Sequence, residues 1–371
     1  MAFNFRFVGT LRPVKDTDKF KGFTEVKYNS GWMTQKLRFN VIAGDNRHLV
    51  EINAGKWVNE EKNVIYAIDT EGKSVKIPWS KRSDPETMNS IADWRIFTVD
   101  TDTRSHRKEL EENGKDEELA VSQNKRKRFL ANTDFCEYVN KVINSEKMNG
   151  KKFRVNGNVV YNYSEKTGKY YHTLEVNTIY MVDDDTEPSS TMDVDFYFTE
   201  GVVEELDDEK AIASGYTTFY DNQTKKSWFT PIDLIIRNGE SEETKKKAMG
   251  LKTRLREIEE NEVRYVRLNC QRFDGAQRRD ITFDDLDDAT KENIEWGLTT
   301  LEDAIRDAGG QMFDKVKTQE IRAVGFSRGF SGGSESTSYT IGDLLRKPIK
   351  EEVVVSDEID IFSDEIDDDD L

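Results

Sequence analysis

The sequence predicts a mainly β protein with some helices, built from small closed β-barrels in tandem and ending in a disordered acidic tail. Three observations lead to this prediction. Strands in which apolar and polar residues alternate recur along the chain. A glycine ends each recurring strand, where a small barrel needs a sharp bend. The last segment, Glu351 to Leu371, contains eleven acidic residues and no basic ones.

The recurring strand is followed by a polar turn and a second alternating strand. The first strands are Phe5–Gly9, Phe153–Gly157 and Ala211–Gly215, and the second strands are Met33–Phe39, Tyr170–Val176 and Trp228–Leu234. A period of two places one face of a strand in a core and leaves the other face open. The pattern predicts three tandem barrels. Three unrelated hairpins in a β-rich chain remain the alternative.

The chain is divided where these strand patterns begin and end. The predicted units are a first barrel at 1–100, a charged loop and short helix at 101–147, a second barrel at 148–200, a third barrel with helical insertions at 208–325, a flexible linker at 326–350 and the acidic tail at 351–371. Residues 101–128 show no apolar period and are expected to be a mobile loop. Within the third unit, Asp274–Gly275 predicts a hairpin turn.

Cysteine and histidine are too few for the usual catalytic or metal sets. Cys136 and Cys270 are expected to be reduced, partly buried thiols. His48, His106 and His172 have no zinc-site spacing, so neither a metal nor a cofactor is expected. Carboxylates cluster at Asp183–Asp185, Asp193, Asp195 and Asp284–Asp288. They fall in turns or at helix starts, where aspartate is favoured as a cap. We therefore expect a non-enzymatic protein, with a metal-dependent nuclease as one rival.

The apolar runs and the N-terminus give no sign of a membrane or secreted protein. No run approaches the ~20 apolar residues that cross a bilayer. Met1–Phe7 alternates polar and apolar residues and lacks the features of a secretion signal. A cytoplasmic protein without membrane contact is expected.

Net charge is distributed unevenly along the chain. The total is −17. The acidic tail holds eleven of these charges, so the preceding 350 residues carry only −6. The body of the protein can therefore carry local basic grooves. The tail has too little apolar material for a core, and its spaced apolar residues offer a partner something to bury.

Aromatic and basic residues gather on the predicted strands, as a single-stranded nucleic acid site requires. Cations follow the phosphates, and rings stack on bases. Lys36 and Arg38 are expected to project opposite to Leu37 and Phe39. The candidate contact residues are Trp32, Lys36, Arg38, Lys125, Arg126, Lys127, Arg128, Arg154, Tyr161, Tyr163, Tyr170, Tyr171, Tyr216, Tyr220, Lys226, Trp228 and Phe229. Of these, Lys125 to Arg128 form a basic block in the charged loop at 101–147, for which phosphate contact and a solvated tether are the alternatives. Strand aromatics often belong to cores instead, so the clusters are stronger evidence than any single member.

In overall arrangement the chain resembles the single-stranded-DNA-binding proteins of bacteriophages, and the wider class in which OB-type barrels precede an acidic tail. The resemblance rests on the Gly9, Gly157 and Gly215 strands, the Gly/Ser-rich segment 327–334 and the ending Asp367–Leu371. It implies coating of single-stranded DNA in replication, recombination and repair. It also implies that the tail recruits a polymerase, helicase or primase through Ile359, Phe362, Ile366, Asp367, Asp368, Asp369, Asp370 and Leu371.

A structural or adaptor protein that uses the same barrels for protein contacts is the main alternative, because fold alone does not assign function. The aromatic strands and the acidic tail favour DNA. With several barrels in one chain, a monomer is expected.

Overall fold

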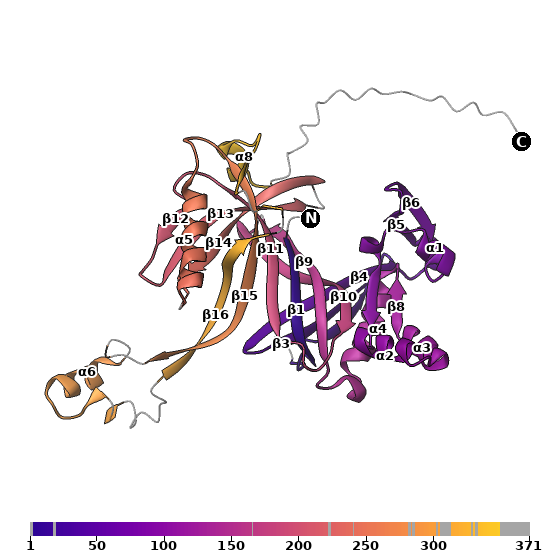
Figure 1. Ribbon diagram of the computed structural model, residues 1–371, viewed down its shortest axis with the longest axis horizontal. Helices are drawn as coiled ribbons and strands as arrows, with labels where there is room; N and C mark the ends of the chain where they lie inside the picture. Colours follow the sequence, from indigo (N-terminus) through magenta and orange to yellow (C-terminus); the bar gives the residue numbers. More distant parts are fainter. Residues whose placement is uncertain are drawn as a thin grey trace, which may run out of the picture.

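The computed structural model describes residues 3–348, except 18, 19, 165, 222, 223, 240, 281, 282, 284, 285, 302, 305–312, 328, 331 and 332. The acidic tail, with the partner-binding residues predicted in it, lies outside the described residues. Two β-barrels lie side by side, and a smaller lobe extends from one of them (Figure 1). Hydrogen-bonded strands of both barrels form one continuous sheet.

The first barrel is a closed circuit of five strands. They are β1 (Phe3–Pro13), β3 (Trp32–Ala43), β4 (Asn46–Trp57), β10 (Lys169–Met181) and β9 (Lys152–Ser164), paired in that order, with β9 returning to β1. β4 and β10 run parallel, and the other pairs are antiparallel. A short strand, β2 (Phe23–Lys27), pairs antiparallel with the first half of β3. Helix α4 (Asn132–Ile143) precedes β9 in the chain and packs Phe135 and Val139 into the core.

The second barrel repeats the same circuit. Its strands are β11 (Ser189–Phe198), β13 (Lys210–Asp221), β14 (Lys226–Arg237), β16 (Phe313–Phe326) and β15 (Arg264–Asp280), with β15 returning to β11. β14 and β16 are the parallel pair. Helix α5 (Glu242–Arg256) lies between the third and fourth strands, as α4 does in the first barrel. β12 (Val203–Glu205) extends β13.

Both circuits are OB-type barrels, which confirms the predicted fold class. The pairing corrects the predicted division into three barrels. The hairpin β9–β10 does not begin a barrel of its own but supplies the last two strands of the first barrel. β11, assigned to the middle unit, is the first strand of the second barrel. Hydrophobic alternation repeats in every strand and therefore does not reveal which distant strand will be its partner.

The predicted glycines allow neighbouring strands to approach each other closely. A Cβ atom at Gly9 would lie 2.1 Å from the carbonyl oxygen of Ile42, and one at Gly157 would lie 1.9 Å from that of Glu175. Only glycine fits where β1 crosses β3 and where β9 crosses β10. Gly157 thus lies in the fourth strand of the first barrel, and not at the equivalent of Gly9.

The lobe beside the first barrel is an insertion between β4 and α4. It contains β5 (Val64–Ile68), β6 (Ser74–Pro78), α1 (Pro85–Asn89), β7 (Phe97–Asp100), α2 (Arg104–Glu112), α3 (Asp116–Gln123) and β8 (Arg126–Phe129), with 3-10 helices at Glu60–Lys62, Trp79–Lys81 and Asp93–Arg95. β7 pairs with β10 and with β8, which joins the lobe to the barrel sheet. The predicted mobile loop at 101–128 is wrong, because the helix α2 capped by Thr103, the helix α3 and part of the strand β8 occupy it.

Two further predictions near the C-terminus are corrected. β15 continues through Asp274–Gly275 without turning and pairs with β16 along its length, so the hairpin turn predicted there is wrong. β15 and β16 extend away from the barrel as a long ribbon, with α6 (Asp288–Glu295) at its far end (Figure 1).

The segment predicted as a flexible linker also folds against the second barrel. We call residues 333–345 the C-terminal strap. Its strand β17 (Glu335–Ser336) pairs with β15, and its helix α8 (Ile341–Leu345) is closed by a capping box at Thr340. Tyr339 and Leu344 cover an aromatic group on the barrel, which makes the linker prediction wrong for this segment.

Among the described residues, no helix is long and apolar enough to cross a membrane. Cys136 and Cys270 are buried and not disulfide-bonded. Burial is the main cause that raises the pKa of the Cys136 thiol, to about 12.

The two barrels meet along β1 and β11 and at a buried polar cluster. Six consecutive residues of β1, Phe3 to Val8, pair with β11. His48 is fully buried, stacks on Phe7 with 4.0 Å between ring centroids, and lies 2.6 Å from the Ser190 hydroxyl. Its Nδ1 is 3.7 Å from the Asp274 carboxylate of the second barrel. The cluster therefore links β4 to β11 and β15.

This cluster predicts that acidification weakens the junction. Burial lowers the pKa of His48 below its ordinary value, while Asp274 opposes the shift and Arg272 reinforces it. Protons then bind the unfolded chain more readily, so stability is complete above about pH 6.5 and falls as pH decreases toward the folded pKa. The melting temperature should decrease on acidification, and by less in His48→Gln. Equal pH profiles for the two proteins would contradict this assignment.

Candidate nucleic-acid interface

The outer face of β3 and β4 carries the first predicted cations. Alternation along β3 buries Leu37 and Phe39 and turns Lys36 and Arg38 outward, as predicted. Both cations pair with Glu51 on β4, at 3.3 Å and 3.6 Å. Glu51 therefore neutralises part of the positive charge on this face.

A groove opens where this face meets the inserted lobe. We call it the tryptophan groove. It encloses about 580 Å³, and its principal side chains are Trp32, Trp57, Lys62, Tyr66, Trp79 and Arg95. Trp32 and Trp57 are direct cross-strand partners, and their rings meet edge to face at 5.2 Å. The Lys62 ammonium lies 5.6 Å from the Trp57 ring centre.

Gly55 makes room for the Trp32 ring on the barrel wall. A Cβ atom at this position would lie 2.4 Å from the Trp32 ring. Because β4 has no side chain here, the indole lies across the strand. The local sequence Gly55-Lys56-Trp57 thus places an aromatic pair at the mouth of the groove.

The lobe supplies the opposite wall. Tyr66 is 63% exposed, and the Lys76 ammonium lies 5.7 Å from its ring. Arg95 donates a 2.7 Å hydrogen bond to the Tyr66 carbonyl, which holds the guanidinium beside the groove. Trp79 is buried, and Arg82 stacks on it at 4.6 Å while pairing with Asp134. One exposed tyrosine, two half-buried tryptophans and the cations Lys62 and Arg95 therefore line one open hollow.

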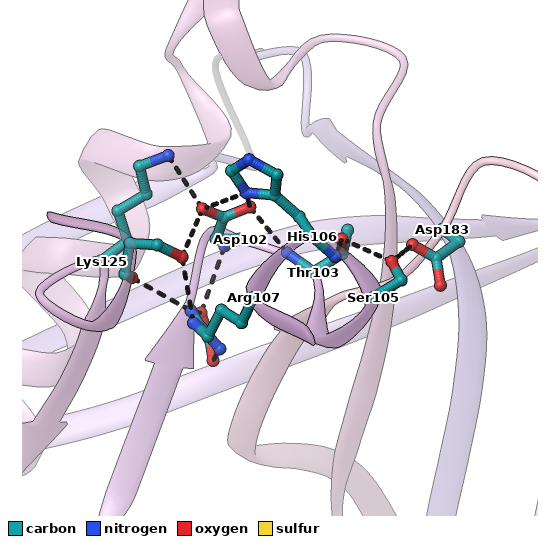
Figure 2. A network of polar contacts seen from close by, with 9 residues as sticks. Asp102, Thr103, Ser105, His106, Arg107, Lys125 and Asp183 are labelled. Atoms are coloured by element: carbon teal, nitrogen blue, oxygen red, sulfur yellow. Dashed lines mark hydrogen bonds and ion pairs between the residues drawn. The ribbon is translucent and has the colours of Figure 1, made fainter. Parts of the chain in front are cut away.

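The predicted basic block belongs to a structured part of the lobe. Figure 2 shows Lys125 in a network around Asp102. The Lys125 ammonium lies 2.9 Å from the Asp102 carboxylate. Although burial alone would raise the pKa of Asp102, hydrogen bonds from Lys125, Ser122 and His106 outweigh it and lower the pKa to about 2. In the same network Arg107 donates two hydrogen bonds to Asp100.

This network changes how the basic block Lys125–Arg128 is interpreted. Lys125 is an ion-pair partner of the lobe, and Arg128 pairs with Asp93 at 3.1 Å. Arg126 and Lys127 are exposed on β8. Arg126 and Lys127 are therefore the better phosphate candidates, and the assignments of Lys125 and Arg128, each paired with an aspartate, stay predictions.

Two aromatic residues of the β9–β10 hairpin lie at the contact between the two barrels. Tyr161 is only 8% exposed and packs against Phe219 of β13, so its assignment as a DNA contact is wrong. Tyr170 meets Phe219 edge to face at 5.8 Å, and its ring is tilted against that of Tyr163 at 4.9 Å. Tyr171 is exposed on the opposite face.

The third predicted cluster is divided between core and surface. Phe229 is 6% exposed under the C-terminal strap, so its assignment to the DNA surface is wrong. Tyr216 packs on the same group. Trp228 is half-buried, and its Nε1 donates a hydrogen bond to Thr224. Tyr220 and Lys226 are exposed on the hairpin between β13 and β14.

Sequence reasoning found Trp32 but missed the rest of its groove. Trp57, Lys62, Tyr66 and Arg95 were not among the candidates. Trp57 stands two residues after Gly55 at the end of an alternating strand, and Trp32 stands at the start of another. The sequence could therefore have indicated that the two tryptophans are neighbours across the strands. The contributions of Tyr66 and Arg95 depend on how the inserted lobe folds back, which strand alternation does not encode.

The described carboxylates give no sign of a metal centre. In the ranges that the structure describes, no group of three His, Cys, Asp or Glu side chains could hold a metal ion. Asp193 accepts a hydrogen bond from Ser327, and Asp195 accepts one from Tyr265.

Together these features define the protein as a tandem OB-type β-barrel protein with an aromatic and basic groove on its first barrel. No protein-family model matches the chain, and no curated protein matches it.

Two solved structures show limited similarity. A deletion mutant of the single-stranded DNA binding protein from Thermus aquaticus is 10% identical, with 73% of this chain and 86% of that chain covered and a TM-score of 0.30. The wild-type protein is 8% identical, with coverages of 73% and 85% and the same TM-score. A TM-score of this size is too low to establish a shared fold.

Proposed function

We propose that this protein binds single-stranded DNA without catalysing a reaction. The tryptophan groove is the observation that carries the proposal. Trp57, Trp32 and Tyr66 offer ring faces and edges in one open hollow, and Lys62 and Arg95 lie beside them. Bases stack on such rings regardless of sequence, at about 1–3 kcal/mol per base, while cations hold the phosphates.

The position of the groove suits a single strand. It lies on an outer wall of an OB-type barrel, where the β3–β4 face borders the inserted lobe. Unstacked bases reach ring surfaces that the bases of a duplex, stacked on one another, do not. Exposed Arg126 and Lys127 on the same lobe extend the cationic surface.

The proposed biological role is protection of single strands during replication, recombination and repair, in the host cytoplasm if the protein comes from a bacteriophage. The acidic segment 351–371 would then recruit a polymerase, helicase or primase. Its eleven carboxylates and its spaced Ile359, Phe362 and Ile366 support this part of the proposal. We propose that one chain acts as a monomer, because it already contains two barrels.

Titration of the full chain with a labelled oligo-dT of about 30 nucleotides tests the proposal. We expect binding at about 50 mM salt, with tryptophan fluorescence quenched by stacking and affinity decreasing steeply toward about 200 mM. Absence of binding at low salt would favour an adaptor protein. Loss of intact oligonucleotide after metal addition would favour a nuclease.

A further inference from the structure

A second hollow lies over the seam where the two barrels join. It crosses the outer faces of β10, β9, β1, β11 and β15 and encloses about 510 Å³. Asparagine is its commonest lining residue, and we call it the asparagine trough. Its central side chains are Asn158, Asn4, Asp193 and Asn269.

These four residues form a row across the sheet. Asn158 pairs with Asn4, Asn4 pairs with Asp193, and Asp193 pairs with Asn269. Each step crosses to the next strand, so the row spans roughly 14 Å at the usual strand spacing. It begins on the first barrel and ends on the second. Because cross-strand partners face the same side of a sheet, the row presents its polar groups to one ligand surface.

The row has hydrogen-bonding capacity to spare. Asn4 Oδ1 is buried and accepts no hydrogen bond from any described residue. A buried acceptor left without a donor is costly. Because this oxygen is closed to solvent in the unbound protein, a ligand gains the hydrogen bond when the Asn4 amide turns toward the trough. Asp193 accepts one hydrogen bond from Ser327 and retains further acceptor sites as a carboxylate.

Charge decides which part of a nucleotide faces the row. The Asp193 carboxylate repels phosphate, so bases rather than phosphates belong there. Arg6 and Arg154, both exposed, border the trough and provide phosphate partners on its sides. Adenine and cytosine carry an exocyclic amine that donates to such acceptors, whereas thymine presents a carbonyl oxygen at that position.

The trough adjoins the tryptophan groove at one point. Trp94 lines the trough, and the next residue, Arg95, lines the groove. Both belong to the 3-10 helix Asp93–Arg95, and Trp94 is 57% exposed. A strand that leaves the groove past Arg95 therefore meets an exposed indole at the entrance of the trough.

We infer that the asparagine trough is a second single-stranded-DNA subsite, which continues the path from the tryptophan groove and prefers amine-bearing bases. This inference rests on the proposed function. Trp94 stacks on a base at the entrance, Asn4 and Asp193 accept hydrogen bonds from adenine or cytosine, and Arg6 and Arg154 contact phosphates.

Titration of the full chain with oligo-dC and oligo-dT of about 30 nucleotides at neutral pH tests the inference. Wild type is expected to bind oligo-dC about tenfold more tightly. Asn4→Leu keeps the side-chain size but removes one of the two acceptors, so it should lower the ratio to about threefold. Trp94→Ala should weaken binding of both oligonucleotides about tenfold. Trp296→Ala is the matched control, since this tryptophan is 77% exposed on the distant ribbon and lies in neither hollow.

The outcomes separate the two proposals. If wild type binds neither oligonucleotide at low salt, the proposed function fails. If it binds both equally, or if Asn4→Leu retains the full preference, the proposed function stands and the trough is not a base subsite. Trp94→Ala binding like wild type, or Trp296→Ala binding as weakly as Trp94→Ala, would also overturn the inference.

Discussion

Replacing Trp57 with alanine is expected to weaken binding of single-stranded oligonucleotides about ten- to a hundredfold. The indole stands at the mouth of the tryptophan groove, edge to face with Trp32 and beside the Lys62 ammonium. Its removal deletes one stacking surface, which is worth about 1–3 kcal/mol per base. It also leaves the Trp32 ring without its edge-to-face partner. Each 1.4 kcal/mol corresponds to about tenfold in affinity. Equilibrium titration of wild type and variant at one salt concentration measures the change.

Two controls make the Trp57 result specific. Trp57→Phe retains a ring and should keep most of the affinity, whereas Trp296→Ala removes an exposed tryptophan far from the groove and should keep all of it. A thermal melt of each variant shows whether the fold is retained. If Trp57→Ala melts and binds like wild type, the groove is not the DNA site.

Replacing Leu344 with alanine is expected to release the C-terminal strap at a cost of about 2–4 kcal/mol. Leu344 is 2% exposed and is buried against Phe229 and Val263. The other attachments include a two-residue strand pairing, hydrogen bonds from Arg264 to Ser334 and from Thr337 to Val263, and the Tyr339 ring between Tyr197 and Phe229. Deleting one anchor from such a short segment should open the strap and leave both barrels folded.

Hydrogen exchange measures this opening at the strap itself. The amides of Thr337 and Leu344, which donate to Val263 and Thr340, should lose protection about thirtyfold or more. Leu345→Ala is a matched control, because the adjacent leucine is 62% exposed and its loss should leave the exchange rates unchanged. Equal protection in wild type and Leu344→Ala would show that the strap does not depend on this anchor.

Strand alternation predicted the local features of the fold well. It placed Lys36 and Arg38 opposite Leu37 and Phe39, and the short helix predicted within 101–147 and a helical insertion predicted within 208–325 are present as α4 and α5. The fold class follows from these elements. Pairing could not be predicted in the same way, because β1 takes partners from β3, β9 and β11, which are far apart in the sequence.

The candidate site was predicted less completely for a related reason. An aromatic residue on an outward face is a DNA contact only if nothing else covers it. Phe229 is covered by the strap, and Tyr161 by the neighbouring barrel. Conversely, Tyr66 and Arg95 face the groove only because the inserted lobe folds against β4. Coverage by distant segments is a tertiary property, so composition indicated the chemistry without its location.

The pairing of strand β1 has a consequence for the number of nucleotides that each protein molecule would bind. The first half of β1 hydrogen-bonds to both β9 and β11. The two barrels are therefore held in one relative position and are not joined by a flexible linker. A nucleic acid lying across them would meet contacts at fixed intervals, whatever its total length. The number of nucleotides held by each molecule would then be constant, set by backbone pairing between the barrels and insensitive to crowding along the strand.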